Sequence, residues 1–375
     1  MNQPELSIVI PCLNEEETLG KSIEMALTFI RNHQVETEII VADNGSTDNS
    51  VAIAEQMGAR VVHVKEKGYG NALRGGIDAA KGGYIIMGDA DNSHDFTAIY
   101  PFIEKLRDGY ELIVGNRFKG GISKGAMSFK NRYIGNPILS FLGRLFFKTN
   151  IRDFHSGLRG FTKDAYNRMN LQTSGMEFAS EMIVKASFAK LKTTEVPIIM
   201  YPDMRSRAPH LKPWRDGWRH LRFLLLYSPR WLFLIPGFFL MMLGFLGFFY
   251  LSIEDVSSNI LLNYLPLSAG IFLIGFQFVT FYGLTKVYAV SNNLLPKSNR
   301  YDSFFEFFTL EKGIFFGFLS VLFGIGLFWF SVGSSGDMPG SVFLKTIIPS
   351  VVLMLLGVQV ILFGFFFSIL GLKKK

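Results

Sequence analysis

The chain has 375 residues, enough for two domains, and 49% of them are hydrophobic, with a mean hydropathy of +0.26. The formal net charge of +7 suits contact with an anionic membrane surface, and nucleic acid is not expected as a partner because the basic residues crowd beside apolar runs. Cys12 is the only cysteine, which excludes an intrachain disulfide and fits a cytoplasmic location of the part of the chain before the apolar runs. The first apolar run stops at Pro11, too early for a signal peptide, so none is expected.

Strands and helices alternate in the first part of the chain. LSIVIP at 6–11 predicts a buried strand, and NEEETLGKSIEMALTFI at 14–30 predicts a helix with Asn14 as its N-cap. Further strands are predicted at 37–43, 59–64 and 83–91, with helices between them. This order predicts an α/β fold, an open, mostly parallel, Rossmann-like sheet with helices on both faces.

Polar side chains follow three of these strands. Glu15 follows the first strand, Asp43 the second, and Asp89 and Asp91 the fourth. Ligands of such sheets bind at the carboxyl ends of the strands, so these residues predict one crevice. The glycine signatures of dinucleotide-binding folds and P-loops are absent from the sequence. A D-x-D pair can hold a divalent ion that bridges two phosphates, although a solvated loop is the alternative reading.

Long apolar runs dominate the rest of the chain. They cover about 231–251, 260–282, 313–332 and 347–372. Each is long enough to cross a bilayer, whereas four nearly uncharged core helices in a row would be hard to bury in a soluble protein. Lys and Arg gather before the first run, between the second and third, and at the chain end, which predicts that both termini face the cytoplasm.

Two stretches combine apolar and basic residues at helical spacing. Before the first run, Trp214, Trp218, Leu221 and Leu225 share one predicted face beside three arginines, as in an interfacial helix (Arg215, Arg219 and Arg222). NPILSFLGRLFFK at 136–148 reads equally well as a second interfacial helix or as core. The predicted organisation is therefore a catalytic domain at 1–204, an interfacial segment at 205–229 and a four-helix transmembrane domain at 230–375.

Several motifs jointly resemble a known family. IVIPCLNEEETL, IIVADNGSTDNS, KGYGNALRGG, MGDADNSHD and GNRF have the order and spacing seen in family 2 glycosyltransferases of the GT-A fold. DFHSGLRGF and the C-terminal runs narrow the resemblance to polyprenyl-phosphate glycosyltransferases, relatives of dolichol-phosphate mannose synthase. It covers roughly residues 5–230. It implies inverting transfer of a sugar from a UDP- or GDP-linked donor to a polyprenyl phosphate, such as undecaprenyl or dolichyl phosphate, with Mg²⁺ or Mn²⁺ as cofactor.

The resemblance also implies roles for individual residues. Asp153 would organise the acceptor or act as base, together with Asp91 and Arg117, and the metal would lie on Asp89 and Asp91. The nucleotide-sugar would contact Pro11, Leu13, Glu15, Asp43, Lys67, Asp89, Ala90, Asp91 and Arg117. The acceptor phosphate would contact Arg132, His155, Ser156, Arg205, Arg207, His210 and Lys212. His155 stands where the family has small or apolar residues, so an exposed turn histidine is an equal reading.

A lipid monophosphate is already anionic, so it needs positive charge at the site more than a general base. We therefore expect Asp153 to orient rather than deprotonate. One alternative is transfer to a diacylglycerol or ceramide hydroxyl. Another is a polysaccharide synthase, but the chain lacks the Q-x-x-R-W motif of those enzymes. A lipid-sugar translocator or scaffold is a third, disfavoured because the apolar runs carry almost no charge. Their many glycines suit close helix packing, within one chain or in a homo-oligomer.

Overall fold

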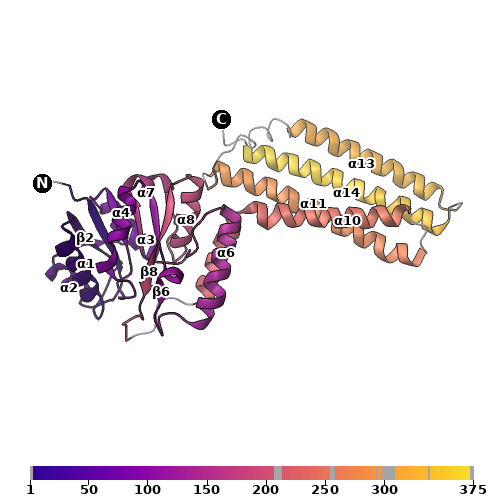
Figure 1. Ribbon diagram of the computed structural model, residues 1–375. Coiled ribbons are helices and arrows are strands. Elements are labelled where there is room, and N and C mark those ends of the chain that lie inside the picture. Colours follow the sequence, from indigo (N-terminus) through magenta and orange to yellow (C-terminus); the bar gives the residue numbers. More distant parts are fainter. Residues whose placement is uncertain are drawn as a thin grey trace. The chain divides into compact units, whose positions relative to one another are not determined.

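The computed structural model describes residues 3–206, 213–253, 258–292, 294–296, 309–336 and 338–371 (Figure 1). The chain forms two compact units, Met1–Leu224 and Leu225–Lys375. The boundary between them falls inside the predicted interfacial segment.

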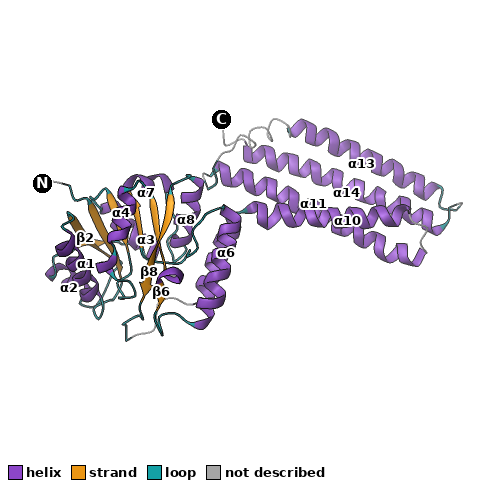
Figure 2. Ribbon diagram, viewed as in Figure 1, coloured by secondary structure: helices purple, strands orange, loops and turns teal. Residues whose placement is uncertain are grey.

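The first unit is built on one sheet of eight strands in the order β3-β2-β1-β4-β7-β5-β8-β6. Figure 2 shows the strands of this unit in orange among its helices. Strands β1, β2, β3 and β4 pair in parallel, as do β5, β8 and β6, whereas β7 runs antiparallel to both of its neighbours. The fold is thus the predicted mostly parallel, Rossmann-like GT-A sheet. The strands are β1 Leu6–Cys12, β2 Thr37–Asp43, β3 Arg60–His63, β4 Tyr84–Met87, β5 Leu112–Asn116, β6 Gly121–Ile122, β7 Arg159–Thr162 and β8 Thr193–Met200.

Alternate residues of the central strands face opposite layers of helices. Ile8 and Val41 belong to the core beneath the helices on one face, whereas a Cβ at Gly76 of α3 would meet Val9 and Ala42 on the other. Both faces are therefore covered, which explains the continuous apolar runs of β1 and β2. The helices of this unit are α1 Leu19–His33, α2 Ser50–Gln56, α3 Tyr69–Ala79, η1 Phe96–Ala98, α4 Tyr100–Arg107, α5 Arg117–Gly120, η2 Asn131–Gly135, α6 Asn136–Phe147, α7 Lys163–Met169, α8 Phe178–Phe188 and α9 Pro213–Leu226.

The expected N-cap of the first helix is wrong. Helix α1 begins at Leu19 with Thr18 as the capping position, and Asn14 instead has a φ of 57° in the loop before it. The Asn14 side chain accepts a hydrogen bond from the Thr47 amide at 2.7 Å. Asn tolerates this left-handed conformation, so Asn14 serves to join the loops after β1 and β2.

The antiparallel direction of β7 decides what lies beside β4. Its residue Arg159 pairs with Met87 at the carboxyl end of β4. The segment that precedes β7, which contains DFHSG, therefore meets the segment that follows β4, which contains D-x-D. A parallel strand in this place would have put its preceding segment at the opposite edge of the sheet.

The second unit consists of long apolar helices. Four of them could cross a membrane by length and composition, at Arg230–Ile253, Asn259–Ser291, Leu310–Gly333 and Gly340–Leu370. Glycines allow close helix approach, because a Cβ at Gly244 would lie 2.4 Å from the Phe272 amide nitrogen and one at Gly357 would lie 2.5 Å from the Gly317 carbonyl. The helical elements are η3 Arg230–Leu234, α10 Ile235–Ile253, α11 Ser258–Ser291, α13 Leu310–Gly333 and α14 Gly340–Gly371.

Candidate active site

The carboxylate at the end of β2 is held by its own turn. Asp43 is buried and accepts hydrogen bonds from the amides of Ser46 at 2.9 Å and Gly45 at 3.2 Å, with His63 Nδ1 at 3.1 Å. Burial alone would raise the pKa of Asp43, but the hydrogen bonds from Ser46, His63 and Gly45 outweigh it and hold the pKa below its usual value. Asp43 is therefore a fixed acceptor at neutral pH, suited to a base N–H.

Asn44 ties this turn to the loop before α3. Its side-chain amide donates to the carbonyls of Val64 and Glu66, and its side-chain oxygen accepts from the Gly68 amide. Lys67 donates to the Asn44 carbonyl at 2.6 Å. Lys67 thus lies beside the Asp43 turn, as a nucleotide-sugar contact would require, although that role stays a prediction.

The D-x-D carboxylates lie just after β4 and have different partners. Asp89 accepts from the Tyr69 hydroxyl at 2.8 Å and lies 3.5 Å from Nε2 of the buried His94, whereas Asp91 accepts from the Ser93 hydroxyl at 2.6 Å. Ser93 therefore supports Asp91 through a hydrogen bond.

The pKa values of the two aspartates are shifted in opposite directions. Burial and the nearby charge of Asp89 raise the pKa of Asp91. Burial opposes the ionisation of Asp89 as well, but His94, Tyr69 and Arg205 outweigh it and lower its pKa. Two adjacent carboxylates with this mutual repulsion favour a cation between them.

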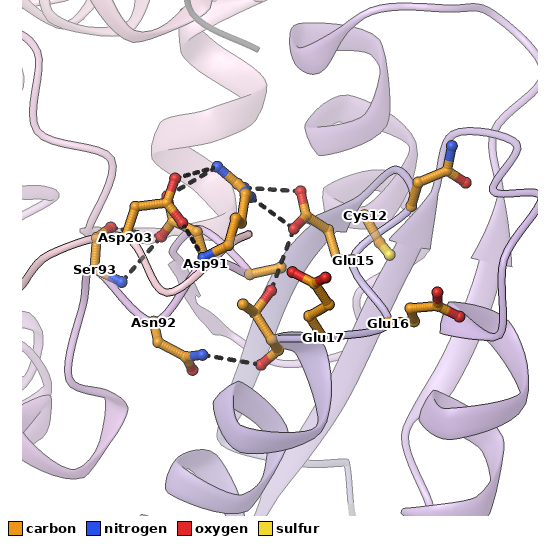
Figure 3. Close-up of polar contacts among 12 residues, drawn as sticks. Cys12, Glu15, Glu16, Glu17, Asp91, Asn92, Ser93 and Asp203 are labelled. Atoms are coloured by element: carbon orange, nitrogen blue, oxygen red, sulfur yellow. Dashed lines mark hydrogen bonds and ion pairs between the residues drawn. The ribbon is translucent and has the colours of Figure 1, made fainter. Parts of the chain in front are cut away.

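Arg205 bridges the loop after β1 and the D-x-D segment. Its guanidinium donates to both carboxylate oxygens of Glu15 at 2.7 Å, and Nη1 lies 3.3 Å from Asp91 and 3.0 Å from Asp203. Figure 3 shows Glu15, Asp91 and Asp203 gathered around this one group. The segment that leads out of β8 is thereby held against the loop after β1 and the D-x-D segment.

Arg205→Gln should strengthen Mn²⁺ binding in the absence of nucleotide by about three- to tenfold, because a guanidinium beside Asp91 repels a cation. A titration of the free ion by electron paramagnetic resonance measures this affinity. Arg107→Gln, which removes an exposed partner of Glu5, is the matched control. Equal Mn²⁺ affinity in all three proteins would show that Arg205 does not compete with the ion.

Asp153 and Arg117 form a buried ion pair. Asp153 is 0% exposed and Arg117 6%, and the guanidinium donates to both carboxylate oxygens at 2.7 and 2.8 Å. The Arg117 amide also donates to Asp153. Glu195 of β8 accepts from the Asp153 amide at 3.1 Å. Asp153 thus holds Arg117 through both carboxylate oxygens, and its role in the reaction stays a prediction.

Arg159, which the sequence did not single out, organises the same loop. It is fully buried and donates to the carbonyls of Phe154, Ser156 and Ala179. Burial lowers the pKa of Arg159 to about 10, so it remains charged at neutral pH. The one available signal was an arginine inside the apolar GLRGF run.

Gly157 brings the DFHSG loop against the D-x-D pair. A Cβ at this position would lie 2.4 Å from Oδ2 of Asp89 and 3.0 Å from Nε2 of His94. Glycine is required for this approach, because any side chain would displace the carboxylate. Asp89 and the DFHSG loop are therefore direct neighbours.

His155 packs edge-on against His220 of α9, with ring centroids 4.6 Å apart. Both His155 nitrogens and the Ser156 hydroxyl are buried without a partner in the described part of the chain, whereas His220 Nδ1 lies 2.8 Å from the Ser180 hydroxyl. His155 is thus not the exposed turn histidine of the alternative reading. The unpaired polar atoms of His155 and Ser156 can therefore still form hydrogen bonds with a bound molecule.

This pair predicts acid sensitivity. Burial lowers the pKa of His220 to about 4, with Arg159 adding to the effect and Asp216 opposing it; burial and neighbouring cations lower that of His155 as well. Between pH 6.5 and about 4 the unfolded chain therefore binds more protons than the folded chain. The free energy of unfolding thus decreases by about 3 kcal/mol for His220 alone as the pH is lowered through this range.

His220→Gln should remove much of this pH dependence, since glutamine does not titrate. Thermal unfolding of the detergent-purified chain at pH 7.5 and pH 5 provides the comparison. His33→Gln, at the exposed last residue of α1, is the control. An identical loss of stability in parent and His220→Gln would assign the acid sensitivity to other groups.

The remaining predicted residues are placed as follows. Pro11 and Leu13 are half-buried at the end of β1, and Ala90 is buried, with its carbonyl accepting from Ser22. Arg132 lies on η2 with its guanidinium 5.5 Å from the centre of the Tyr133 ring. Their roles stay predictions. Arg207, His210 and Lys212 lie outside the described residues, as does the side chain of Trp214.

Helix α9 buries a face other than the Trp/Leu face of the prediction, as an interfacial helix would. Its buried residues are Asp216, His220, Phe223 and Leu224, whereas Trp218 is 60% exposed. Of the predicted Trp/Leu face, Trp218 is thus exposed and Leu221 and Leu225 are half-buried, and the interfacial role stays a prediction. Its arginines Arg215, Arg219 and Arg222 are exposed as well.

The side chains of Asp89 and Asp91 decide whether this site can hold a metal ion. Among the described residues, no group of three or more His, Cys, Asp or Glu side chains is arranged to hold an ion. Asp89 and Asp91 offer hard oxygen donors and excess negative charge. Mg²⁺ and Mn²⁺ accept this arrangement when substrate phosphates and water complete the shell. The residues thus fit a metal that binds together with a nucleotide diphosphate.

A Rossmann-like sheet with paired carboxylates after β4 and an acceptor-side loop against them defines a glycosyltransferase domain of the GT-A type. The chain matches the family model "Glycosyl transferase family 2" over residues 7–169 and "Glycosyltransferase family 2 C-terminal transmembrane region" over 283–371. It is 33% identical to the low-salt glycan biosynthesis hexosyltransferase Agl6 of Haloferax volcanii, over 98% of this chain and 89% of that one. The chain belongs to glycosyltransferase family 2.

Two further similarities were found. A dolichyl-phosphate hexose transferase of Haloferax volcanii is 26% identical, over 52% of this chain and 82% of its own length. A solved structure of glucosyl-3-phosphoglycerate synthase from Mycobacterium tuberculosis, in complex with Mn²⁺, UDP and glucosyl-3-phosphoglycerate, is 21% identical with a TM-score of 0.45, covering 60% of this chain and 78% of that one. The chain is thus a membrane-integral glycosyltransferase with hexosyltransferase relatives.

Proposed function

We propose that this glycosyltransferase transfers a sugar, with inversion, from a UDP- or GDP-sugar to a polyprenyl phosphate at the cytoplasmic membrane face. The observation that carries the proposal is the meeting of the D-x-D pair with a cation-rich acceptor loop, in a chain with four apolar helices. The similarity to a dolichyl-phosphate hexose transferase supports a polyprenyl acceptor.

On the donor side, the ends of β1, β2 and β4 would hold the nucleotide. Asp43 would accept from the base, and Pro11, Leu13 and Ala90 would line the ribose. Mg²⁺ or Mn²⁺ bound at Asp89 and Asp91 would neutralise charge on the departing diphosphate. For this, Arg205 must exchange its contact with Asp91 for phosphate oxygens, which a guanidinium fork suits well.

On the acceptor side, the chain supplies cations rather than a free base. Asp153 fixes Arg117 through two hydrogen bonds, and Arg159 holds the loop backbone through three carbonyls. A lipid monophosphate needs no deprotonation, so its oxygen can attack the anomeric carbon in line once Arg117 has offset its repulsion from the diphosphate. A hydroxyl acceptor would need a base, and Asp153 is already occupied.

The membrane placement is part of the proposal. Basic residues before the first apolar helix predict that the catalytic unit and both termini are cytoplasmic. The exposed Trp218 and the arginines of α9 suit headgroup depth. An acceptor that stays in the bilayer could then present its phosphate to the catalytic unit.

The test is sugar transfer by the full chain in detergent, with a panel of radiolabelled UDP- and GDP-sugars, polyprenyl phosphate, and either Mn²⁺ or a chelator. A metal-dependent lipid product that mild acid cleaves supports the proposal and identifies the donor. Product formed only with diacylglycerol or ceramide would move the enzyme to glycolipid synthesis. Failure of every donor to bind a folded chain would favour a translocator or scaffold.

A further inference from the structure

A basic cavity lies on the first unit, apart from the D-x-D pair. It has a volume of about 470 Å³ and is lined by Lys119, Arg144, Thr149, Asn150 and Arg152. These come from α5, from α6 and from the segment between α6 and Asp153. Three of the lining side chains are cations, and the other two offer hydroxyl and amide groups. This is the donor set that recognises a phosphate group.

The cavity carries surplus positive charge. Glu195 is the acidic neighbour, with Lys119 at 3.3 Å, and its oxygens also accept the backbone amides of Arg152 and Asp153. Within the described ranges, the side chains of Arg144 and Arg152 have no acidic partner, and Nε of Arg144 is buried without any hydrogen bond. A buried guanidinium N–H without a partner is costly, so an anion here would satisfy it.

The helix that supplies Arg144 presents an apolar face to the outside. Arg144 lies between Gly143, which is buried, and Leu145, which is 40% exposed. The exposed apolar side chains at helical spacing from just before η2 through α6 are Phe129, Tyr133, Ile134, Ile138, Phe141 and Leu145. Such a face on a chain with four membrane-spanning candidates favours a bilayer as its occupant. Arg144 would then lie at headgroup depth.

We propose that this cavity binds the phosphate headgroup of an anionic membrane lipid while the outer face of α6 enters the bilayer. Its lining residues include neither Arg117 nor the D-x-D pair, so the inference does not depend on the proposed sugar acceptor. It lies next to the acceptor loop, because Arg152 directly precedes Asp153 and both amides bind Glu195. Lipid binding would thus steady the loop that fixes Arg117.

The test measures lipid binding to the full chain in neutral detergent by native mass spectrometry. The probes are dioctanoyl phosphatidylglycerol, a short polyprenyl phosphate, dioctanoyl phosphatidylcholine and inorganic phosphate. Arg144→Gln/Arg152→Gln should weaken binding of the anionic lipids about tenfold, and Arg152→Gln alone, at an exposed side chain, about threefold. Arg31→Gln/Lys81→Gln removes the same charge from exposed positions elsewhere and should leave binding unchanged.

Each outcome decides the matter. Selective loss of anionic lipid in the cavity variants supports the site, and the better of the two anionic lipids identifies its source. Inorganic phosphate binding as tightly as the lipids would make it a free-anion site and overturn the lipid assignment. Equal binding by parent, cavity and control proteins would overturn the site itself. Cooperative thermal unfolding of each variant shows that it is folded without recourse to sugar transfer.

Discussion

Asp91→Asn should reduce the rate of sugar transfer about a hundredfold or more, while leaving the folded chain at least as stable as the parent. The charge of Asp89 and burial already raise the pKa of Asp91, so losing this charge relieves repulsion in the folded state. The same change removes a hard oxygen ligand that a metal–diphosphate needs. Transfer is measured in detergent at saturating Mn²⁺, and stability by thermal unfolding.

Asp108→Asn is the matched control. It neutralises an exposed aspartate that pairs with Lys105 and should change neither activity nor stability. Transfer by Asp91→Asn within a few fold of the parent would remove this carboxylate from the catalytic machinery. A large loss of stability would instead mean that the Arg205 bridge, rather than repulsion from Asp89, dominates at this position.

Asp153→Ala should destabilise the first unit by about 3–5 kcal/mol, because it leaves the buried guanidinium of Arg117 without its counter-charge. Transfer should fall as well, since Arg117 loses the two hydrogen bonds that aim it. The double variant Arg117→Met/Asp153→Ala should recover part of the stability but none of the activity. Thermal unfolding and transfer assays separate the two effects.

This pattern distinguishes a positioning carboxylate from a catalytic base. Asp153→Asn retains an acceptor for Arg117, so residual transfer should exceed that of Asp153→Ala. A base would instead lose activity equally in both variants, with a changed pH profile. Additive stability losses for Arg117→Met and Asp153→Ala would contradict the direct pairing on which the prediction rests.

The sequence predicted the sheet and the polar residues after its strands because their signals are local, whereas the ligand crevice stays a prediction. Apolar runs of β1 and β2 ending in Glu15 and Asp43, and the D-x-D after β4, report strand ends directly. The antiparallel direction of β7 was not predicted, since pairing over long sequence separation leaves no periodic signal. It decides, nonetheless, that Gly157 meets Asp89.

Contacts between segments that lie far apart in the sequence could not be predicted either. Arg205 reaches Glu15 across 190 positions, and His220 of α9 contacts His155, which lies in the loop before β7. Asn14 was predicted as a helix cap because its type suits caps and left-handed loops alike, and only the contact with Thr47 separates these readings. The buried Arg159 resembled an ordinary loop arginine, since its partners are backbone carbonyls.

The strand order has a consequence for biosynthesis. Strand β5 lies between β7 and β8, so the sheet is complete only when Thr193–Met200 has been translated. The first apolar helix candidate begins later, at Arg230. Because domains generally fold as units in the order of their synthesis, the catalytic unit can close its sheet while the membrane anchor is still to be made. A nascent chain would then deliver a folded enzyme to the membrane rather than assemble one there.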